Sequence, residues 1–282
     1  KGLAWQQLDY PCYLKRRSAK GLATCNVIPW FGFTGIAVVH DVCYRARRDF
    51  YRDTRRARLS AAWHCLQYRR IAQKAERIIT VSEFSKAEIH KYYGVPPEKM
   101  DVVYNAWQQM QRIAPDDGVF ARHPQLQKGG YYFSMANLLK NKNFPWVLRA
   151  AKAKPDAMFA IAGGGSLAEE AGRLGLADLP NVVYLGYVSD GEAKSLMANC
   201  RAFLFPTLYE GFGIPPLEAV GQSRSWSATR PACGRYTATV RGILTWIPTP
   251  ATWTTPPHPK PIRSCCWKST AGRRVQRSCW GF

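Results

Sequence analysis

The sequence predicts an α/β protein with two doubly wound, Rossmann-like domains and a tail of different character. Short β-branched runs alternate with helical patterns in two blocks, a polar segment with Pro and Gly separates the blocks, and the composition changes after about residue 221. The predicted divisions are a first domain at 1–105, a linker at 106–128, a second domain at 129–221 and an unstructured tail at 222–282.

Seven apolar runs are predicted as strands. Each is short and bounded by glycine or polar residues, as expected for buried parallel strands that feed loops. They lie at 35–41, 77–82, 100–105, 131–134, 158–165, 181–186 and 201–206. Because doubly wound sheets bind ligands at the carboxyl ends of their strands, we look for functional residues there.

Helices of the first block are predicted from periodicity and capping signals. Over 59–76 the apolar residues recur at helical spacing, with Arg and Gln opposite. This apolar face consists of Leu59, Ala62, Trp63 and Leu66. SKAE at Ser85–Glu88 has the spacing of a capping box, and Gly94 with Pro96 ends the helix that it starts.

Helices of the second block carry similar signals. Asn143 is the predicted cap of a helix with Pro145 in its first turn. SDGE at Ser189–Glu192 has capping-box spacing for a helix to Ala198, and a further helix is predicted from about Pro215.

The net charge of +21 is unevenly distributed. Residues 222–282 hold 10 of the 40 basic residues and none of the 19 acidic ones, which leaves +11 for the rest of the chain. A second basic zone at 45–77 is read either as a solvated helix face or as a surface attracted to an anionic membrane, and the sequence does not choose. We do not expect nucleic-acid binding from this charge, although a basic arm for nucleic acid or membrane is the rival interpretation of the tail.

Other sequence features narrow the class of protein. The sequence contains no run of eighteen apolar residues, so no membrane span is predicted. The chain starts at Lys1 without Met and shows no readable signal peptide, so we expect it to be a fragment. The nine cysteines lack metal-ligand spacing, so we expect free thiols in the cytoplasm and no metal site.

Glycines and charged residues gather where predicted strands end. Gly163 and Gly164, and likewise Gly211 and Gly213 around Phe212, let backbone amides approach a phosphate, although a tight turn without a ligand fits as well. Further candidate residues are Glu210 and Glu218, whose carboxylates could face one crevice, Lys142 as a phosphate counter-charge, and His40 as a polar contact. Taken alone, residues of these types are more often solvated or structural side chains.

The order of these residues resembles a known family. PTLYEGFGIPPLEA, at 206–219, resembles the signature of glycosyltransferase family 4, retaining enzymes with the GT-B fold. The upstream segments VVHD, IITVSEFSK, KMDVVYNA, NKNF, IAGGGS and VVYLGYVSDGEAKSLMANCRAFLFP occur in the family's order. The resemblance covers roughly residues 25–221 and implies two Rossmann-like GT-B domains, both incomplete here.

The resemblance also implies roles for single residues. Glu210 would lie by the donor hexose, Glu218 would bind the nucleotide ribose, and His40 would lie near the transferred sugar. The implied donor contacts of the second domain are Lys142 at the pyrophosphate, Gly163 and Gly164 in the phosphate pocket, Tyr187 and Val188 by the base, and the amides of Gly211, Phe212 and Gly213. The family's arginine before the lysine is absent, since Ala136 and Asn137 stand there. No metal or other cofactor is implied.

The implied function is hexosyl transfer, of mannose or glucose, from a nucleotide-sugar to a saccharide or lipid-linked acceptor in bacterial polysaccharide synthesis. The alternatives are an inactive remnant, another GT-B enzyme such as a sugar-nucleotide epimerase, or a basic nucleic-acid-binding protein. The last rests on five tryptophans interleaved with arginines in the tail.

We interpret the tail as the product of a reading-frame slip near Val220–Gln222. Permitted codons for residues 222–238, read from the third base, allow Ser-Asp, Pro, Leu, Glu, Tyr and Gly-Asp in the order in which the family continues. This hypothesis also accounts for a segment without acidic residues and rich in Arg, Trp, Ser, Cys and Pro.

Overall fold

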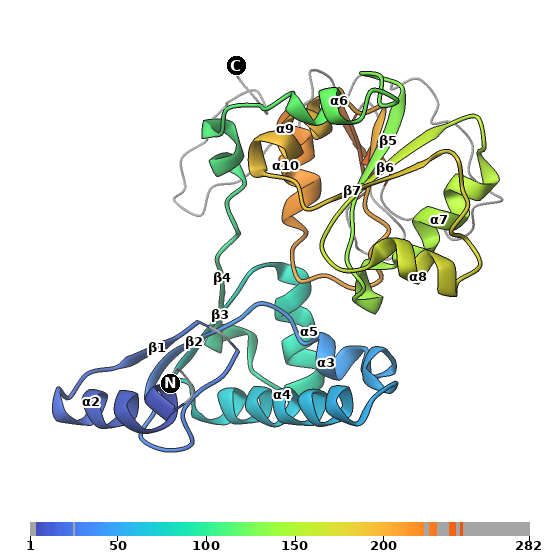
Figure 1. Ribbon diagram of the computed structural model, residues 1–282. Helices are drawn as coiled ribbons and strands as arrows, with labels where there is room; N and C mark the ends of the chain where they lie inside the picture. Colours follow the sequence, from blue (N-terminus) through green and yellow to red (C-terminus); the bar gives the residue numbers. More distant parts are fainter. Residues whose placement is uncertain (1–3, 25, 223–225, 230–236, 241–242, 245–282) are drawn as a thin grey trace.

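The computed structural model describes residues 4–24, 26–222, 226–229, 237–240 and 243–244. Two parallel sheets, one from each half of the chain, are flanked by helices (Figure 1). The GT-B architecture predicted from the sequence is confirmed in this respect.

The first sheet has the strand order β1-β2-β3-β4, and all of its strands are parallel. The strands are β1 (Gly21–Ala23), β2 (Gly35–Val39), β3 (Arg77–Thr80) and β4 (Met100–Val102). Strand β1 was not predicted, because GLA is too short to show a pattern. The helices of this first half of the chain are η1 (Trp5–Asp9), α2 (Tyr10–Arg16), α3 (Cys43–Ala46), η2 (Arg48–Tyr51), α4 (Arg55–Lys74), α5 (Glu83–Tyr93) and η3 (Pro97–Lys99).

The second sheet has the order β11-β8-β5-β6-β7, again all parallel. The strands are β5 (Tyr131–Met135), β6 (Met158–Ala162), β7 (Val182–Gly186), β8 (Ala202–Leu204) and β11 (Ile243–Leu244). The helices are η5 (Lys140–Lys142), α7 (Phe144–Ala153), α8 (Leu167–Arg173), α9 (Asp190–Asn199) and α10 (Ile214–Gln222).

Alternation along the strands gives the second sheet two cores. Tyr131 and Phe133 pack in one cluster with side chains of α9, whereas Tyr132 packs on the other side with side chains of α7. Successive strand residues point to opposite faces, so a sheet covered by helices on both faces buries every position. This explains why the strands are continuous apolar runs.

The segment predicted as a linker is packed against the second half of the chain. It contains η4 (Gln108–Arg112) and α6 (Gly118–Arg122). Val119 and Leu126 are buried in the core of the second sheet, and a Cβ added to Gly221 of α10 would overlap the Trp107 ring. The segment 106–128 is therefore packed against the second half of the chain near both of its ends.

Part of the predicted unstructured tail has regular structure. Strands β9 (Trp226–Thr229) and β10 (Thr237–Val240) form an antiparallel pair, and β11 extends the second sheet beside β8. The edge of β8 is therefore paired in this structure. The remainder of 222–282 lies outside the described residues, and the frame-slip hypothesis stays a prediction.

The helix predicted over 59–76 is α4, but its apolar face is not its buried face. Leu59 is 71% exposed and Leu66 is 43% exposed. The residues that α4 buries are Ala61, Gln67, Tyr68 and Ile71. Periodicity alone identified a face without showing which face meets the sheet.

Three predicted helix starts had different outcomes. The capping box at Ser189 and Glu192 is confirmed at the start of α9. The one at Ser85 is wrong, because α5 begins three residues earlier and Ser82 Oγ accepts the Ser85 N–H. Asn143 precedes α7 as predicted, but it has a positive φ of 53° and makes no capping hydrogen bond. Its amide donates instead to the Pro206 carbonyl at 3.0 Å.

Candidate functional site

The carboxyl end of β2 meets the loop before α10, and this contact joins the two halves of the chain. Ser82 Oγ donates to the Gly211 carbonyl oxygen at 2.5 Å. Ser85 Oγ donates to the His40 carbonyl oxygen at 2.9 Å. Both serines are buried at the start of α5, so this helix end holds one carbonyl from each half. We call this contact the serine seam.

Gly211 is required at the serine seam by close packing. A Cβ at this position would overlap the His40 carbonyl oxygen and would lie 3.1 Å from Asp41 Cβ. Any side chain here would push the two halves apart. The glycine thus has a structural reason that is independent of a ligand.

Glu210, one residue earlier, is paired with Lys142 from η5. Lys142 Nζ lies 2.7 Å from Glu210 Oε1. About a quarter of each side chain is exposed to solvent, 24% for Lys142 and 23% for Glu210. Thr207 Oγ1 lies 2.9 Å from the same carboxylate oxygen. A partly buried, charge-assisted pair of this kind is stronger than an exposed one. The structure therefore brings together two of the predicted site residues.

Asp41 adds a second carboxylate from the first half, which the sequence analysis did not select. Burial raises its pKa, and the negative charge of Glu210 raises it further. The Cys43 N–H, which donates to Asp41 Oδ1 at 2.7 Å, and the Lys142 charge oppose this shift. The available signal was its place in VVHD, directly after His40.

His40 lies at the serine seam through its backbone. Its N–H donates to Asn26 Oδ1 at 3.1 Å, and its carbonyl accepts from Ser85. Its side chain is exposed at the end of β2. The imidazole is therefore open to a ligand, but no described contact tests its predicted role.

Further contacts fix how the two halves meet. Arg47 Nη1 donates to the Leu208 carbonyl at 3.4 Å, and Lys140 Nζ pairs with Asp53 at 2.6 Å. Tyr209, between Leu208 and Glu210, is buried. The loop that carries Glu210 is thus tied to the first half on both sides of the serine seam.

Glu218 has different neighbours. It lies on α10, where its Oε1 accepts from Gln109 Nε2 at 3.4 Å. Burial raises its pKa, and the charge of Asp190 acts in the same direction. Among the described residues, its contacts share none with those of Glu210, so the single crevice proposed for the two carboxylates stays a prediction.

The glycine loop before α10 offers backbone donors. Within the described part of the chain, the N–H groups of Gly211, Phe212 and Gly213 donate to no protein acceptor. Gly213 has a φ of +88°, which favours glycine, and Phe212 lies against the Tyr104 ring with 6.2 Å between centroids. These amides are available to an anion at the start of α10.

The second glycine cluster is only partly available. The Gly163 N–H donates to the Gly186 carbonyl at 2.8 Å, and a Cβ on Gly163 would overlap the Ala136 carbonyl oxygen. The amide of Gly163 is therefore used within the sheet rather than kept for a phosphate. Gly164 is exposed, with open space around its Cβ position.

The two residues expected beside the nucleotide base differ in exposure. Tyr187 is 86% exposed and can receive a ligand ring. Val188 is buried in the core cluster of the second sheet with side chains of α9. Its side chain is committed to that core and is a poor candidate for a base contact.

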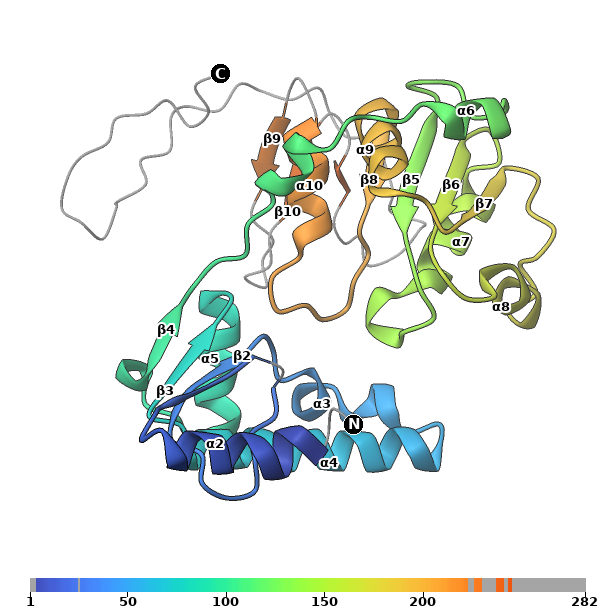
Figure 2. The same ribbon diagram turned by 60° about the vertical axis from the view of Figure 1, so that its left-hand side comes forward.

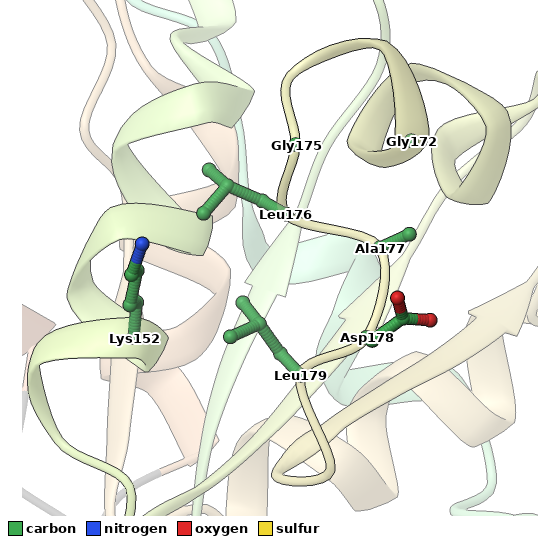
Figure 3. A pocket seen from close by; sticks show the side chains of 7 residues that line it. All are labelled: Lys152, Gly172, Gly175, Leu176, Ala177, Asp178 and Leu179. Carbon is green, nitrogen blue, oxygen red and sulfur yellow. The ribbon is translucent and has the colours of Figure 1, made fainter.

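A cavity of roughly 360 Å³ between α7 and the segment after α8 contains none of the predicted residues (Figure 3). Leu176 and Leu179 point toward α7, while the Asp178 carboxylate points away from Lys152. This hollow lacks converging polar groups. Among the described residues, no group of three His, Cys, Asp or Glu side chains could hold a metal ion, and no helix is long and apolar enough to cross a bilayer.

Two family models match the two halves of the chain. Residues 21–107 match the model described as Glycosyltransferase Family 4, and residues 119–222 match that described as Glycosyl transferases group 1. The two matches cover the first sheet and the second sheet in the order that the structure shows.

The chain belongs to the family 4 glycosyltransferases. Curated relatives of this family 4 chain include the O-antigen chain mannosyltransferase RfbU of Salmonella typhimurium, 29% identical over 157 residues, and the O-antigen chain mannosyltransferase B of Escherichia coli, 28% identical over 169 residues. These matches take in 54% and 52% of this chain and 41% of each relative. The chain thus matches less than half of the length of these relatives.

Solved structures share the fold of this family 4 chain. Sucrose-phosphate synthase from Thermosynechococcus elongatus has a TM-score of 0.56 at 13% identity, over 77% of this chain and 57% of the other. The Anabaena protein HepE, solved with UDP and glucose, has a TM-score of 0.50 at 19% identity, over 67% of this chain and 51% of the other. At these identities the likeness shows the GT-B fold alone.

Proposed function

We propose that this family 4 chain transfers a hexosyl residue from a nucleotide-sugar to an acceptor hydroxyl, with retention of anomeric configuration. The observation that carries the proposal is the Lys142–Glu210 pair beside the free amides of 211–213, all next to the first-half residues His40 and Asp41. Positive and negative groups thus converge where the two halves meet.

The positive groups suit a diphosphate leaving group. As the bond between the sugar C1 and the phosphate oxygen breaks, the bonding pair leaves with the diphosphate. Lys142 Nζ and the amides of Gly211, Phe212 and Gly213 would hold this charge without reorganisation. No metal enters the proposal, because these groups supply the positive potential.

The carboxylates suit the sugar. Glu210 would accept hydrogen bonds from hexose hydroxyls once a phosphate competes for Lys142, and Glu218 would accept from the ribose. The acceptor oxygen forms the new bond to C1 on the face that the diphosphate leaves. The acceptor proton passes to a departing phosphate oxygen, which keeps the charge balanced.

The names of relatives suggest the substrates. Two of them are O-antigen chain mannosyltransferases, and one of Campylobacter jejuni, 29% identical over 154 residues, is named for a diphospho-undecaprenol acceptor. We therefore propose a mannose donor first, and a saccharide or lipid-linked acceptor at the cytoplasmic face of a membrane. The four described cysteines are free thiols, in line with that compartment.

Nucleotide-sugar binding and turnover test the proposal. The chain is melted with GDP-mannose, UDP-glucose and UDP-galactose, because a ligand at 100 times its Kd stabilises the native state by about 2.7 kcal/mol. Release of nucleoside diphosphate is then measured with acceptor. Release of nucleoside diphosphate that requires the acceptor is the expected result. Binding without release identifies an inactive remnant, and donor conversion without acceptor identifies an epimerase. Either result, or the failure of all three nucleotide-sugars to raise the midpoint, overturns the proposal.

A further inference from the structure

The surface of α4 turned away from the second sheet carries an unexplained combination of side chains. Figures 1 and 2 show α4 along the side of the first sheet that lies farthest from the second sheet. Six exposed residues lie on one stripe of this helix at successive spacings of three or four: Arg55, Leu59, Ala62, Leu66, Arg69 and Gln73. At 1.5 Å per residue the stripe is roughly 27 Å long.

The charge around this stripe is strongly positive. Residues 45–74 contain ten basic residues and only two acidic ones, Asp49 and Asp53. Arg47 binds Asp49 at 2.9 Å, and Lys140 of the other half binds Asp53 at 2.6 Å. Both carboxylates are thus neutralised away from the stripe, and the exposed arginines of α4 have no ion pair within the described residues.

A groove opens beside the stripe. It is about 600 Å³ in volume, and its lining includes Arg45, Arg48, Leu66, Arg69, Tyr92 and Tyr93. The Arg45 guanidinium lies over the Tyr92 ring, 5.6 Å from its centroid, and among the described residues none accepts a hydrogen bond from its side chain. Arg45, Arg48 and Arg69 have no carboxylate partner within the described residues, and guanidinium groups of this kind are able to bind a phosphate group.

We propose that the exposed stripe of α4 and this groove dock the protein on an anionic lipid surface, with lipid phosphates in the groove. Leu59 and Leu66 would enter the interfacial region while the flanking arginines meet the headgroups. Charge complementarity favours this occupant, and exposed leucines between arginines distinguish it from a soluble phosphate or a nucleic acid. The inference does not depend on the proposed transfer reaction.

Vesicle sedimentation of the full chain tests the proposal. The vesicles are pure phosphatidylcholine, or phosphatidylcholine with about one third phosphatidylglycerol. Binding is expected only to the anionic vesicles. The variant Arg48→Ala/Arg69→Ala should lower the partition coefficient at least tenfold, because each basic residue near an anionic surface contributes about fivefold. The matched control Arg149→Ala/Lys152→Ala removes two exposed cations of α7 and should change it less than twofold.

A second variant separates lipid docking from other anion binding. Leu59→Ser/Leu66→Ser keeps every charge and should still weaken vesicle binding severalfold, since both side chains are exposed in the free protein. Equal binding by this variant, release of the wild type by millimolar pyrophosphate, or tighter binding to single-stranded DNA would each overturn the proposal. Thermal melting of each variant confirms that it is folded.

Discussion

Lys142 Nζ lies 2.7 Å from Glu210 Oε1, and this pair joins η5 to the loop before α10. Neither residue belongs to the first sheet, yet the charges of both reach Asp41 at the end of β2. The pair therefore connects the second half of the chain to the electrostatics of the first. The following predictions concern this contact and its surroundings.

Replacing Lys142 should affect catalysis more than folding. In Lys142→Gln the diphosphate loses one preorganised positive group, and kcat/KM for the donor is expected to fall about 10²–10³-fold. Lys152→Gln on α7 changes an exposed lysine in the same way and should leave kcat/KM unchanged. Equal activity of the two variants would remove Lys142 from the site.

Gly211→Ala should destabilise the protein, because the added methyl group overlaps the His40 carbonyl oxygen. Overpacking of this kind costs about 1–3 kcal/mol. Gly164→Ala is the matched control, since its Cβ would meet nothing within 4 Å. Urea unfolding should show a lower midpoint for Gly211→Ala only. Similar midpoints for the two variants would mean that the serine seam accommodates the methyl group without a loss of stability.

Ser82→Ala should cost more than the loss of a helix cap. An N-cap serine or threonine contributes about 1 kcal/mol. Ser82 also donates to the buried Gly211 carbonyl. Ser85 Oγ lies 3.2 Å from the same carbonyl, but its one hydroxyl hydrogen must then serve both Gly211 and His40, so one acceptor loses its donor at a further cost of about 1–3 kcal/mol. Thr54→Ala removes only the cap of α4, where Thr54 accepts from Ala57 N–H. The difference in free energy of unfolding between the two variants measures how much the hydrogen bond of Ser82 in the serine seam contributes to stability.

Asp41 should make the protein less stable as the pH rises. Its folded-state pKa lies above the ordinary value of 3.8, because burial favours the neutral form. At a pH between 3.8 and the folded-state pKa, the folded chain holds a proton that the unfolded chain has released. The free energy of unfolding is therefore highest, as far as Asp41 is concerned, below about pH 4, and it falls as the pH rises through the folded-state pKa.

Asp41→Asn tests this sign, because an asparagine can still accept from the Cys43 N–H. Its free energy of unfolding should exceed that of the wild type at pH 7 and equal it below pH 3.8. Asp49→Asn should behave oppositely, since the hydrogen bond from Arg47 lowers the pKa of Asp49 and stabilises its charged form. The same direction in both variants would refute the assignment.

Sequence predicted most of the strands and one complete capping box because these signals are local. Ser189 and Glu192 satisfy each other within one turn of α9, so spacing alone identifies them. The prediction of a capping box at Ser85 is wrong because Ser82, three residues earlier, is the N-cap and its side chain accepts from the Ser85 N–H. The buried face of α4 likewise depends on which residues the sheet covers.

The candidate site was predicted residue by residue but not as a set of contacts. The resemblance of PTLYEGFGIPPLEA to the family signature selected Glu210 and Glu218, which have separate neighbours in the structure. Asp41 was passed over because its burial and its interaction with Glu210 exist only once the two halves meet. Sequencing the encoding DNA across residues 218–240 tests the separate prediction of a frame slip.

The carbonyls of His40 and Gly211, both held at the start of α5, bear on how such proteins can be recombined. A chimera that joined residues 1–118 of this chain to the corresponding second half of another protein would meet the same steric requirement at position 211. Only partners that bring a residue without a side chain to that point would fit. Successful exchange between homologues should therefore depend on one backbone contact more than on overall percentage identity.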